Sequence, residues 1–184
     1  FTKELCNRLS QVFFCGSYGD PIVHPDFLNI LRDFRRKNPT LWLYMHTNAG
    51  VHNTQWWTEL AEIINGYGKI DFGIDGLEDT NHIYRRNVLW DKVMDNATTF
   101  IAGGGIAYWD FIVFDHNQEQ VDAAEILSKQ MGFAKFSAKR TSRFLNRKHE
   151  YESKLTVYNK KNLVDYIIYP PSDPKYRNSN YDKL

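Results

Sequence analysis

Short apolar runs alternate along this chain with longer segments in which apolar residues recur every three or four positions. Runs of the first kind are typical of buried β-strands, and segments of the second kind are typical of α-helices with one buried face. The pattern predicts strands at residues 11–14, 41–46, 69–74, 106–114 and 135–139. It predicts helices at residues 2–9, 27–37, 54–65, 90–101 and 118–131. Such regular alternation favours a parallel α/β sheet with right-handed crossovers.

The residues at the ends of several segments support these assignments. Asp26 and Thr54 are of the types preferred at helix N-caps, and each stands where a predicted helix begins. Pro39 ends the second helix, and Gly132 follows the last one, where a glycine commonly stops a helix.

The regular pattern ends near residue 140. Residues 155–158 and 164–169 are expected to pair as a hairpin, and the chain beyond Pro170 and Pro171 is expected to be an extended tail. We therefore expect an α/β unit over residues 1–150 and, over residues 151–184, a C-terminal extension or the start of a downstream region. The chain begins at Phe1, without a methionine and close to a predicted helix, which suggests a fragment of a longer protein.

The composition narrows the class of protein. The chain has 184 residues, of which 42% are hydrophobic and 15% aromatic, so it can bury the core of one globular domain. A net charge of +1 argues against nucleic acid as a partner, and the lack of a long apolar run argues against a membrane. We expect a cytoplasmic protein whose two cysteines, Cys6 and Cys15, are reduced.

Polar side chains follow every predicted strand. Parallel strands of a β/α barrel bring their carboxyl ends to one mouth, where ligands bind. The residues in these positions are Gly16 to Asp20, then His46, Thr47 and Asn48, then Asp75 and Gly76, then Asp115, His116 and Asn117, and finally Lys139 and Arg140. We therefore expect a partial (β/α) TIM-type barrel of about five parallel strands in sequential order, with helices on its outer face and one site at its mouth.

Several of these motifs resemble those of the radical S-adenosylmethionine enzymes. The segment Gly16-Ser17-Tyr18-Gly19-Asp20-Pro21 is similar to their Gly-Gly-Glu-Pro motif, and His24-Pro25 is similar to a His-Pro pair that often follows it. The sequence LYMHTNA at residues 43–49 resembles their strand that ends in Thr-Asn-Gly, and FGIDG at residues 72–76 resembles their Ser-Ile-Asp-Gly. Residues 82–96 resemble their arginine segment with the following helix, and residues 111–117 resemble their fifth strand. The resemblance covers residues 9–144.

This resemblance implies a binding site for S-adenosylmethionine as the cofactor. The implied site residues are Gly16, Ser17, Tyr18, Gly19, Asp20, Thr47, Asn48, Asp75, Arg85, Arg86, Phe114 and Asn117. Asp20 stands at the position of the family's glutamate and, with the backbone around it, would hold the methionyl ammonium by charge-assisted hydrogen bonds. Either Arg85 or Arg86 would pair with the methionyl carboxylate.

The remaining implied residues surround the nucleoside. Thr47 and Asn48 would line the floor of the site, and Asp75 is the candidate for the ribose hydroxyls. Phe114 and Asn117 would border the adenine. The chain departs from the family at two positions here, since Gly73 replaces a serine that reaches the ribose in many members and Ala49 replaces a usual glycine.

The three-cysteine motif that binds the family's [4Fe–4S] cluster is absent from this sequence. The resemblance therefore implies that only a full-length parent would carry the cluster, generate a 5′-deoxyadenosyl radical and abstract hydrogen from a substrate. A peptide or protein is the substrate that the resemblance favours. Without the cluster, the 184 residues are expected to be inactive.

Two alternatives remain open. Asp20, His24, His46, Asp75 and His116 would ring a divalent metal at the barrel mouth of a metal-dependent hydrolase. In the other alternative, the chain is a non-catalytic binding module that presents basic residues to an acidic partner. Those residues are Lys139, Arg140, Arg143, Arg147 and Lys148.

The apolar strand at residues 11–14 suggests a homodimer. If this strand lies at an edge, its backbone donors and acceptors have no neighbour on one side, and no lysine or proline protects them. We therefore expect self-association that buries this strand together with the helix at residues 2–9.

Overall fold

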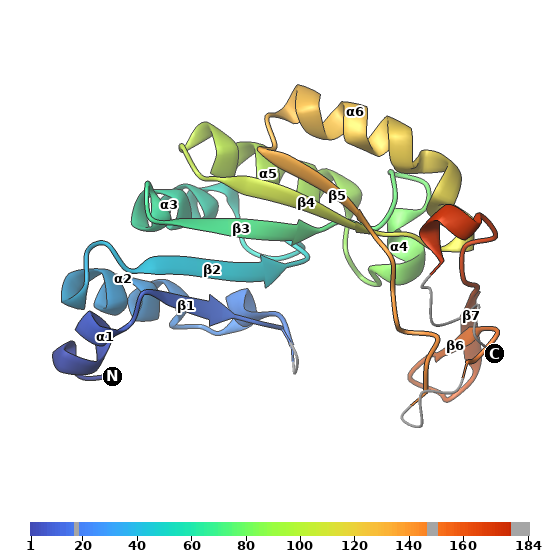
Figure 1. Ribbon diagram of the computed structural model, residues 1–184, viewed down its shortest axis with the longest axis horizontal. Helices are drawn as coiled ribbons and strands as arrows, with labels where there is room; N and C mark the ends of the chain where they lie inside the picture. The colour runs from blue at the N-terminus through green and yellow to red at the C-terminus, as the bar shows by residue number, and fades with distance from the viewer. Residues whose placement is uncertain (17–18, 147–150, 178–184) are drawn as a thin grey trace.

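The computed structural model describes residues 1–16, 19–146 and 151–177. Its main sheet has five parallel strands in the order β1-β2-β3-β4-β5. These are β1 (Gln11–Phe14), β2 (Trp42–Thr47), β3 (Gly68–Gly73), β4 (Ala107–Ile112) and β5 (Lys135–Lys139). The predicted fold class is confirmed, because the strands follow one another in the sheet as they do in the sequence (Figure 1).

Six α-helices belong to the described part of the chain. They are α1 (Lys3–Arg8), α2 (Phe27–Lys37), α3 (Thr54–Ile64), α4 (Asn81–Tyr84), α5 (Trp90–Ala102) and α6 (Val121–Met131). None of the helices in the described ranges is long and apolar enough to cross a membrane.

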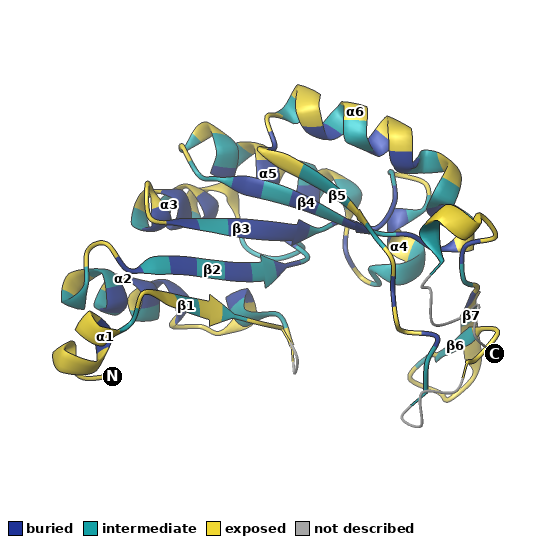
Figure 2. Cartoon of the chain, in the orientation of Figure 1, coloured by how far each residue is buried: buried dark blue, intermediate teal, exposed yellow. Residues whose placement is uncertain are grey.

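The two faces of the sheet carry different residues. Alternate residues such as Met45, Phe72 and Trp109 are fully buried and form one core with residues of α2, α3, α5 and α6. Figure 2 shows the resulting dark layer of buried residues along β2, β3 and β4. The intervening residues are polar or aromatic, as at His46 and Asp71, and they line an open face. Since parallel sheets are normally covered on both faces, this one-sided packing resembles part of a barrel.

The spacing of the strands depends on one glycine at the start of β3. A Cβ atom built on Gly68 would lie 2.2 Å from the carbonyl oxygen of Leu43 on β2. No residue with a side chain fits there without moving the backbone, so the sequence provides a glycine at this contact between β2 and β3.

The structure corrects several predicted ends. Asp26 precedes α2 but makes no side-chain capping bond, and Asn53, not Thr54, caps α3 by accepting a hydrogen bond from the Trp56 N–H at 3.0 Å. The predicted strand at 106–114 ends at Ile112, because the chain turns there into a 3-10 helix, η2 (Asp115–Gln120), that leads into α6. Helix α4 was not predicted, since four residues are too few to show a helical period.

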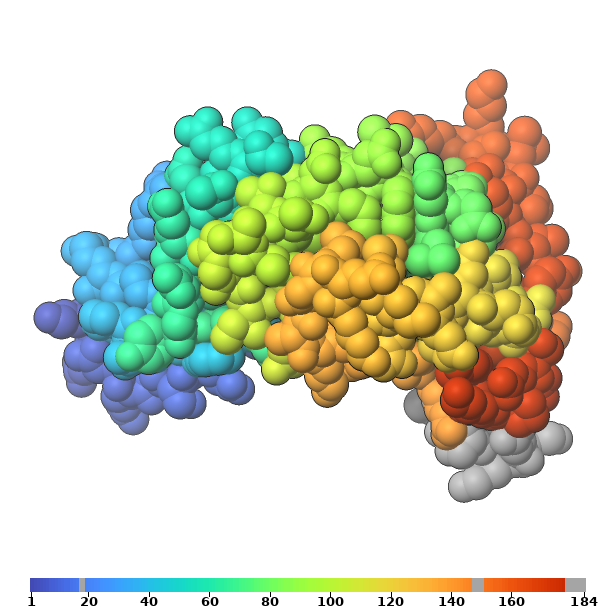
Figure 3. Space-filling model, turned by 90° about the horizontal axis from the view of Figure 1, so that it is seen from above, coloured from blue at the N-terminus to red at the C-terminus, as the bar shows by residue number. Residues whose placement is uncertain are grey.

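A hairpin of β6 (Leu155–Tyr158) and β7 (Val164–Ile168) follows, as predicted, and its strands are antiparallel. It packs on the α/β unit through a small second core of Phe114, Phe144 and Ile168. Figures 1 and 3 show it at the end of the molecule opposite the N-terminus. The expected division at residue 150 falls within residues 147–150, which lie outside the described residues.

Among the described residues, β1 pairs in the sheet with β2 alone, so it is an edge strand. The expected edge is therefore present, and Phe13 on it is 43% exposed. Self-association through this edge remains a prediction.

Candidate functional site

A cavity of about 530 Å³ lies over the open face of the sheet and the carboxyl ends of its strands. Every strand of the main sheet, or the loop that follows it, contributes to the walls. The lining residues are Phe13, Cys15, Gly16, Gly19, Asp20, His46, Thr47, Asn48, Asp71, Gly73, Arg85, Asp110, Ile112, Lys139 and Arg143. Of the predicted site residues, Gly16, Gly19, Asp20, Thr47, Asn48 and Arg85 are among them, whereas Ser17 and Tyr18 lie outside the described residues.

Asp20 joins the loop after β1 to the end of β2. One carboxylate oxygen accepts hydrogen bonds from the Thr47 hydroxyl at 2.7 Å and the Asn48 N–H at 2.8 Å. The other accepts from the Ile22 N–H at 3.2 Å. A carboxylate has about four acceptor sites, so Asp20 can accept one further hydrogen bond from a ligand in the cavity.

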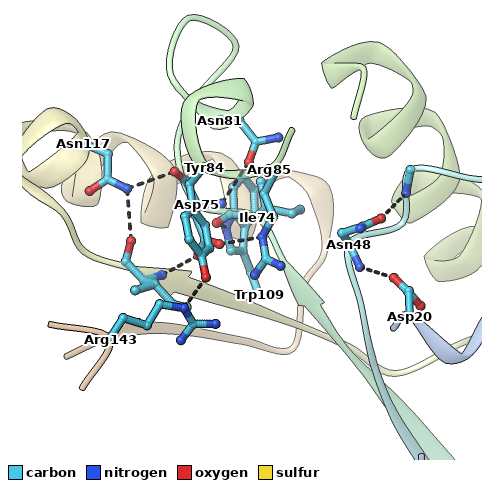
Figure 4. Close-up of polar contacts among 12 residues, drawn as sticks. Asp20, Asn48, Ile74, Asp75, Asn81, Tyr84, Arg85, Trp109, Asn117 and Arg143 are labelled. Carbon is cyan, nitrogen blue, oxygen red and sulfur yellow. Dashed lines mark hydrogen bonds and ion pairs between the residues drawn. The ribbon is translucent and has the colours of Figure 1, made fainter. Parts of the chain in front are cut away.

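Arg85 reaches the cavity from the residue after α4. Its Nε donates to a carboxylate oxygen of Asp75 at 2.6 Å, and its two terminal nitrogens make no hydrogen bond with a described residue (Figure 4). Gly73 at the end of β3 provides the space for this guanidinium, because a Cβ atom there would lie 2.4 Å from an Arg85 terminal nitrogen. The departure from the family's serine at this position therefore has a local reason.

Asp75 is fully buried beneath Arg85. Its second carboxylate oxygen accepts from the Ile112 N–H at 2.6 Å. Burial raises the pKa of Asp75, and Arg85 together with the Ile112 N–H opposes that shift by favouring the ionised form. With one hydrogen bond to each oxygen and no exposed surface, Asp75 positions Arg85, and the contact with ribose hydroxyls that the resemblance implies stays a prediction.

The structure distinguishes the two neighbouring arginines. Arg86 forms an ion pair with Asp165 on β7, and its guanidinium lies 5.0 Å from the ring centroid of Tyr166. Arg86 is therefore directed to the hairpin, and Arg85 is the one of the pair that lines the cavity.

Phe114 and Asn117 are fully buried and do not line the cavity. The Asn117 amide donates to the carbonyl oxygens of Asp75 at 2.9 Å and Ile112 at 3.0 Å. Phe114 packs with Tyr84, with ring centroids 4.7 Å apart. Asn117 thus joins the segments that follow β3 and β4, and Phe114 packs against α4. The expected contact of these two residues with adenine stays a prediction.

Sequence reasoning did not single out a polar network on the open face. Asp71 accepts hydrogen bonds from Tyr44 at 2.5 Å and Lys69 at 2.8 Å, and His46 Nε2 lies 3.1 Å from it. Burial alone would raise the pKa of Asp71, but the hydrogen bonds from His46, Lys69 and Tyr44 outweigh it and hold the pKa at about 2. The sequence does carry a signal of this network, because each of these polar residues alternates with a buried apolar residue in its strand.

The ring of metal ligands expected for a hydrolase is not assembled. His24 accepts a hydrogen bond from the Asp26 N–H at 3.1 Å, and His116 stacks on Phe114. Within the described ranges, His46, Asp71 and Asp110 do offer ligand atoms within 4.8 Å of one another. However, Lys69 and Lys139 already form ion pairs with the two carboxylates, which disfavours a divalent cation there.

The basic residues of the binding-module alternative do not form one surface in the described part of the chain. Lys139 pairs with Asp110, the Arg140 Nε donates to the Lys175 carbonyl at 3.0 Å, and the Arg143 Nε donates to the Tyr84 hydroxyl. Arg147 and Lys148 lie outside the described residues.

The residues of this chain do not suffice for an iron–sulfur cluster. Cys6 is buried in α1 and Cys15 is exposed after β1, and the sequence has no third cysteine. A [4Fe–4S] cluster normally needs three or four cysteine thiolates.

Solved structures with this fold include proteins that hold S-adenosylmethionine. SuiB from Streptococcus suis, bound to S-adenosylmethionine, is 17% identical, with a TM-score of 0.61 over 79% of this chain and 33% of that chain. The protein anSMEcpe, with bound AdoMet and the Cp18Cys peptide, is 18% identical, with a TM-score of 0.57 over 83% of this chain and 45% of that chain. Archaeal TYW1 is 10% identical, with a TM-score of 0.54 over 88% of this chain and 56% of that chain.

No protein-family model and no curated protein sequence matches the chain. The chain spans from about a third to little more than half of the length of these three proteins. At this level of identity the likeness concerns the fold. The chain therefore shares the fold of the matched parts of these three proteins, in agreement with the predicted partial barrel.

Proposed function

We propose that this chain is the S-adenosylmethionine-binding part of a radical S-adenosylmethionine enzyme. The observation that carries the proposal is the cavity in which a carboxylate, Asp20, and a guanidinium, Arg85, both face the ends of the parallel strands. The methionyl end of S-adenosylmethionine carries an ammonium and a carboxylate, so it needs one group of each charge.

In this proposal Asp20 accepts a hydrogen bond from the methionyl ammonium with its remaining acceptor site. The two terminal nitrogens of Arg85 bind the methionyl carboxylate in the paired geometry that guanidinium groups favour. Asp75 holds Arg85 by its Nε and so orients both terminal nitrogens toward the cavity. Thr47 and Asn48 fix Asp20 and form the adjoining floor.

When bound next to a [4Fe–4S] cluster, S-adenosylmethionine supplies a 5′-deoxyadenosyl radical that abstracts hydrogen from a substrate. Because the chain has two cysteines, we propose that the cluster is held by residues outside these 184. The part described here binds and orients the cofactor and does not cleave it alone.

We further propose a peptide as the substrate. A structure of SuiB bound to the precursor peptide SuiA is 18% identical to this chain, with a TM-score of 0.60, and anSMEcpe was solved with a bound peptide. The open face beside Asp20 and Arg85 carries hydrogen-bonding side chains, which suits a peptide backbone. We also propose a cytoplasmic location, a compartment in which Cys6 and Cys15 would remain reduced.

Calorimetric titration with S-adenosylmethionine tests the proposal. We expect measurable binding to the wild-type chain and an affinity about tenfold or more weaker for Arg85→Gln, the range for losing a charge-assisted hydrogen bond. Arg86→Gln is the matched control, because it removes the same charge from the next residue, which pairs with Asp165. Equal affinities of the Arg85 and Arg86 variants, or no binding by the wild type, would contradict the proposed site.

We also propose that the chain associates with a second copy through β1. The edge position of β1 and the exposure of Phe13 support this contact. Light scattering across the micromolar range is expected to show a dimer, and a monomer throughout that range would oppose it.

A further inference from the structure

The cavity holds more positive charge than the methionyl carboxylate needs. Besides Arg85, its wall includes Arg143, which follows β5, and Lys139 at the end of β5. If Arg85 pairs with the cofactor, as proposed above, two cationic side chains remain on the same cavity and are available to another ligand.

Tyr84 holds the two guanidinium groups near each other. The central carbon of Arg85 lies 5.3 Å from the Tyr84 ring centroid, and that of Arg143 lies 5.2 Å from it. The Arg143 Nε also donates a hydrogen bond to the Tyr84 hydroxyl, and Figure 4 shows both guanidiniums beside this ring. The Tyr84 ring is fixed in turn by its packing on the buried Phe114.

Arg143 shares the field of the buried Asp75 carboxylate with Arg85, whose Nε is bonded to that carboxylate. Arg143 itself forms no ion pair with any residue in the described ranges, and its Nε donates to the Tyr84 hydroxyl. Lys139 pairs with Asp110, but its side chain is still 43% exposed while that of Asp110 is 14% exposed. Lys139 lines the cavity, and its ammonium has donors besides the one given to Asp110; the two terminal nitrogens of Arg143 make no hydrogen bond with a residue in the described part of the chain.

We propose that Arg143 and Lys139 bind a carboxylate of the substrate, next to the cofactor held by Arg85. This inference rests on the proposed function and adds a substrate class to it, a peptide with an acidic side chain or a free C-terminus near the reacting residue. A planar guanidinium with two available nitrogens matches a carboxylate, and the partly enclosed wall strengthens such a bond.

Nuclear magnetic resonance of the ¹⁵N-labelled chain tests this assignment, because Arg85 and Arg143 each have their own Nε–H signal. The probes are acetyl-Asp-methylamide, with an acidic side chain, acetyl-Ala, with a free C-terminus, and acetyl-Asn-methylamide as the neutral analogue. Each is titrated to millimolar concentration, with and without saturating S-adenosylmethionine. We expect an acidic probe to shift the Arg143 signal and to bind about five- to tenfold more tightly than the neutral one.

The variants Arg143→Gln and Lys139→Gln are expected to remove this preference for the acidic probe. Arg36→Gln is the matched control, because it removes a charge from an exposed side chain on α2. This variant is expected to keep the preference for the acidic probe. Preference for either acidic probe supports the subsite and identifies the source of the carboxylate.

Equal binding of acidic and neutral probes would overturn the proposal, as would loss of the preference when S-adenosylmethionine is present. The cofactor is followed separately at the Arg85 signal. Failure of the cofactor to bind would therefore refute the proposed function without being confused with failure of the carboxylate subsite.

Discussion

Replacing Asp75 is expected to affect the fold and the cavity together. Its carboxylate accepts one hydrogen bond from the Arg85 Nε and another from the Ile112 N–H, both at 2.6 Å, and it is fully buried. Asp75→Asn keeps one amide oxygen for the Ile112 N–H and loses the ion pair. Asp75→Ala loses both hydrogen bonds and leaves the Ile112 N–H without its partner.

The sizes of the two effects follow from these contacts. Losing a hydrogen bond to a charged group costs about 1.5–3 kcal/mol, which is the expected destabilisation for Asp75→Asn. Removing one member of a buried ion pair costs about 3–5 kcal/mol, and Asp75→Ala is expected at the lower end because Arg85 keeps some contact with water.

Urea unfolding followed by tryptophan fluorescence measures both values. Asp165→Asn is the control, because it breaks the more exposed pair with Arg86 and is expected to cost less than about 1 kcal/mol. Equal stability of Asp75→Asn and Asp165→Asn would mean that the buried pair of Asp75 and Arg85 does not stabilise the fold more than the exposed one. A variant Asp75→Ala that is no less stable than Asp75→Asn would contradict the role of the hydrogen bond to the Ile112 N–H.

Three further outcomes are expected. Gly73→Ala is predicted to weaken S-adenosylmethionine binding in calorimetry, since the new Cβ would displace the Arg85 guanidinium, and unchanged affinity would contradict this. Gly68→Ala is predicted to destabilise the fold by about 1–3 kcal/mol in urea unfolding, because its Cβ would meet the Leu43 carbonyl oxygen, and a neutral effect would oppose the described strand spacing. Folding lowers the pKa of Asp71 from 3.8 to about 2, so its ionised carboxylate contributes about 2 kcal/mol to the free energy of unfolding. This contribution is complete above about pH 5 and is lost as the pH falls toward 2. Asp71→Asn is therefore expected to weaken the dependence of the free energy of unfolding on pH in this range. An unchanged dependence would count against the hydrogen bonds of Asp71 with Tyr44, His46 and Lys69.

The sheet could be predicted because its core repeats a simple pattern. Strands such as residues 11–14 and 135–139 have the bounds that the sequence indicated, since apolar runs between turn-forming residues are unambiguous when helices separate them. The end of β4 and the start of α6 could not be predicted as well. The chain passes between them through η2, whose polar residues are compatible with a loop or a helix.

The orientation of the site residues was harder to predict from the sequence than the positions of the strands. Arg85 and Arg86 are adjacent, so only the turn at the end of α4 decides which one faces the cavity. An asparagine that joins two strand ends, such as Asn117, has the same sequence signature as one that contacts a ligand, and its burial appears only in the structure. Arg143 lies beyond the last strand of the main sheet, where no periodicity predicts its direction.

The alternation of core-facing and cavity-facing residues along each strand limits how the sequence of this protein can vary. Met45 supports the core while His46, the next residue, faces the cavity, and the same holds for neighbours in β3 and β4. Substitutions on the cavity face can therefore alter ligand preference with little effect on packing. An insertion or deletion of one residue within a strand would exchange the two faces, placing charges in the core and apolar groups in the cavity. Variation among relatives is thus expected to be rich in point changes within the strands and to confine changes of length to the loops.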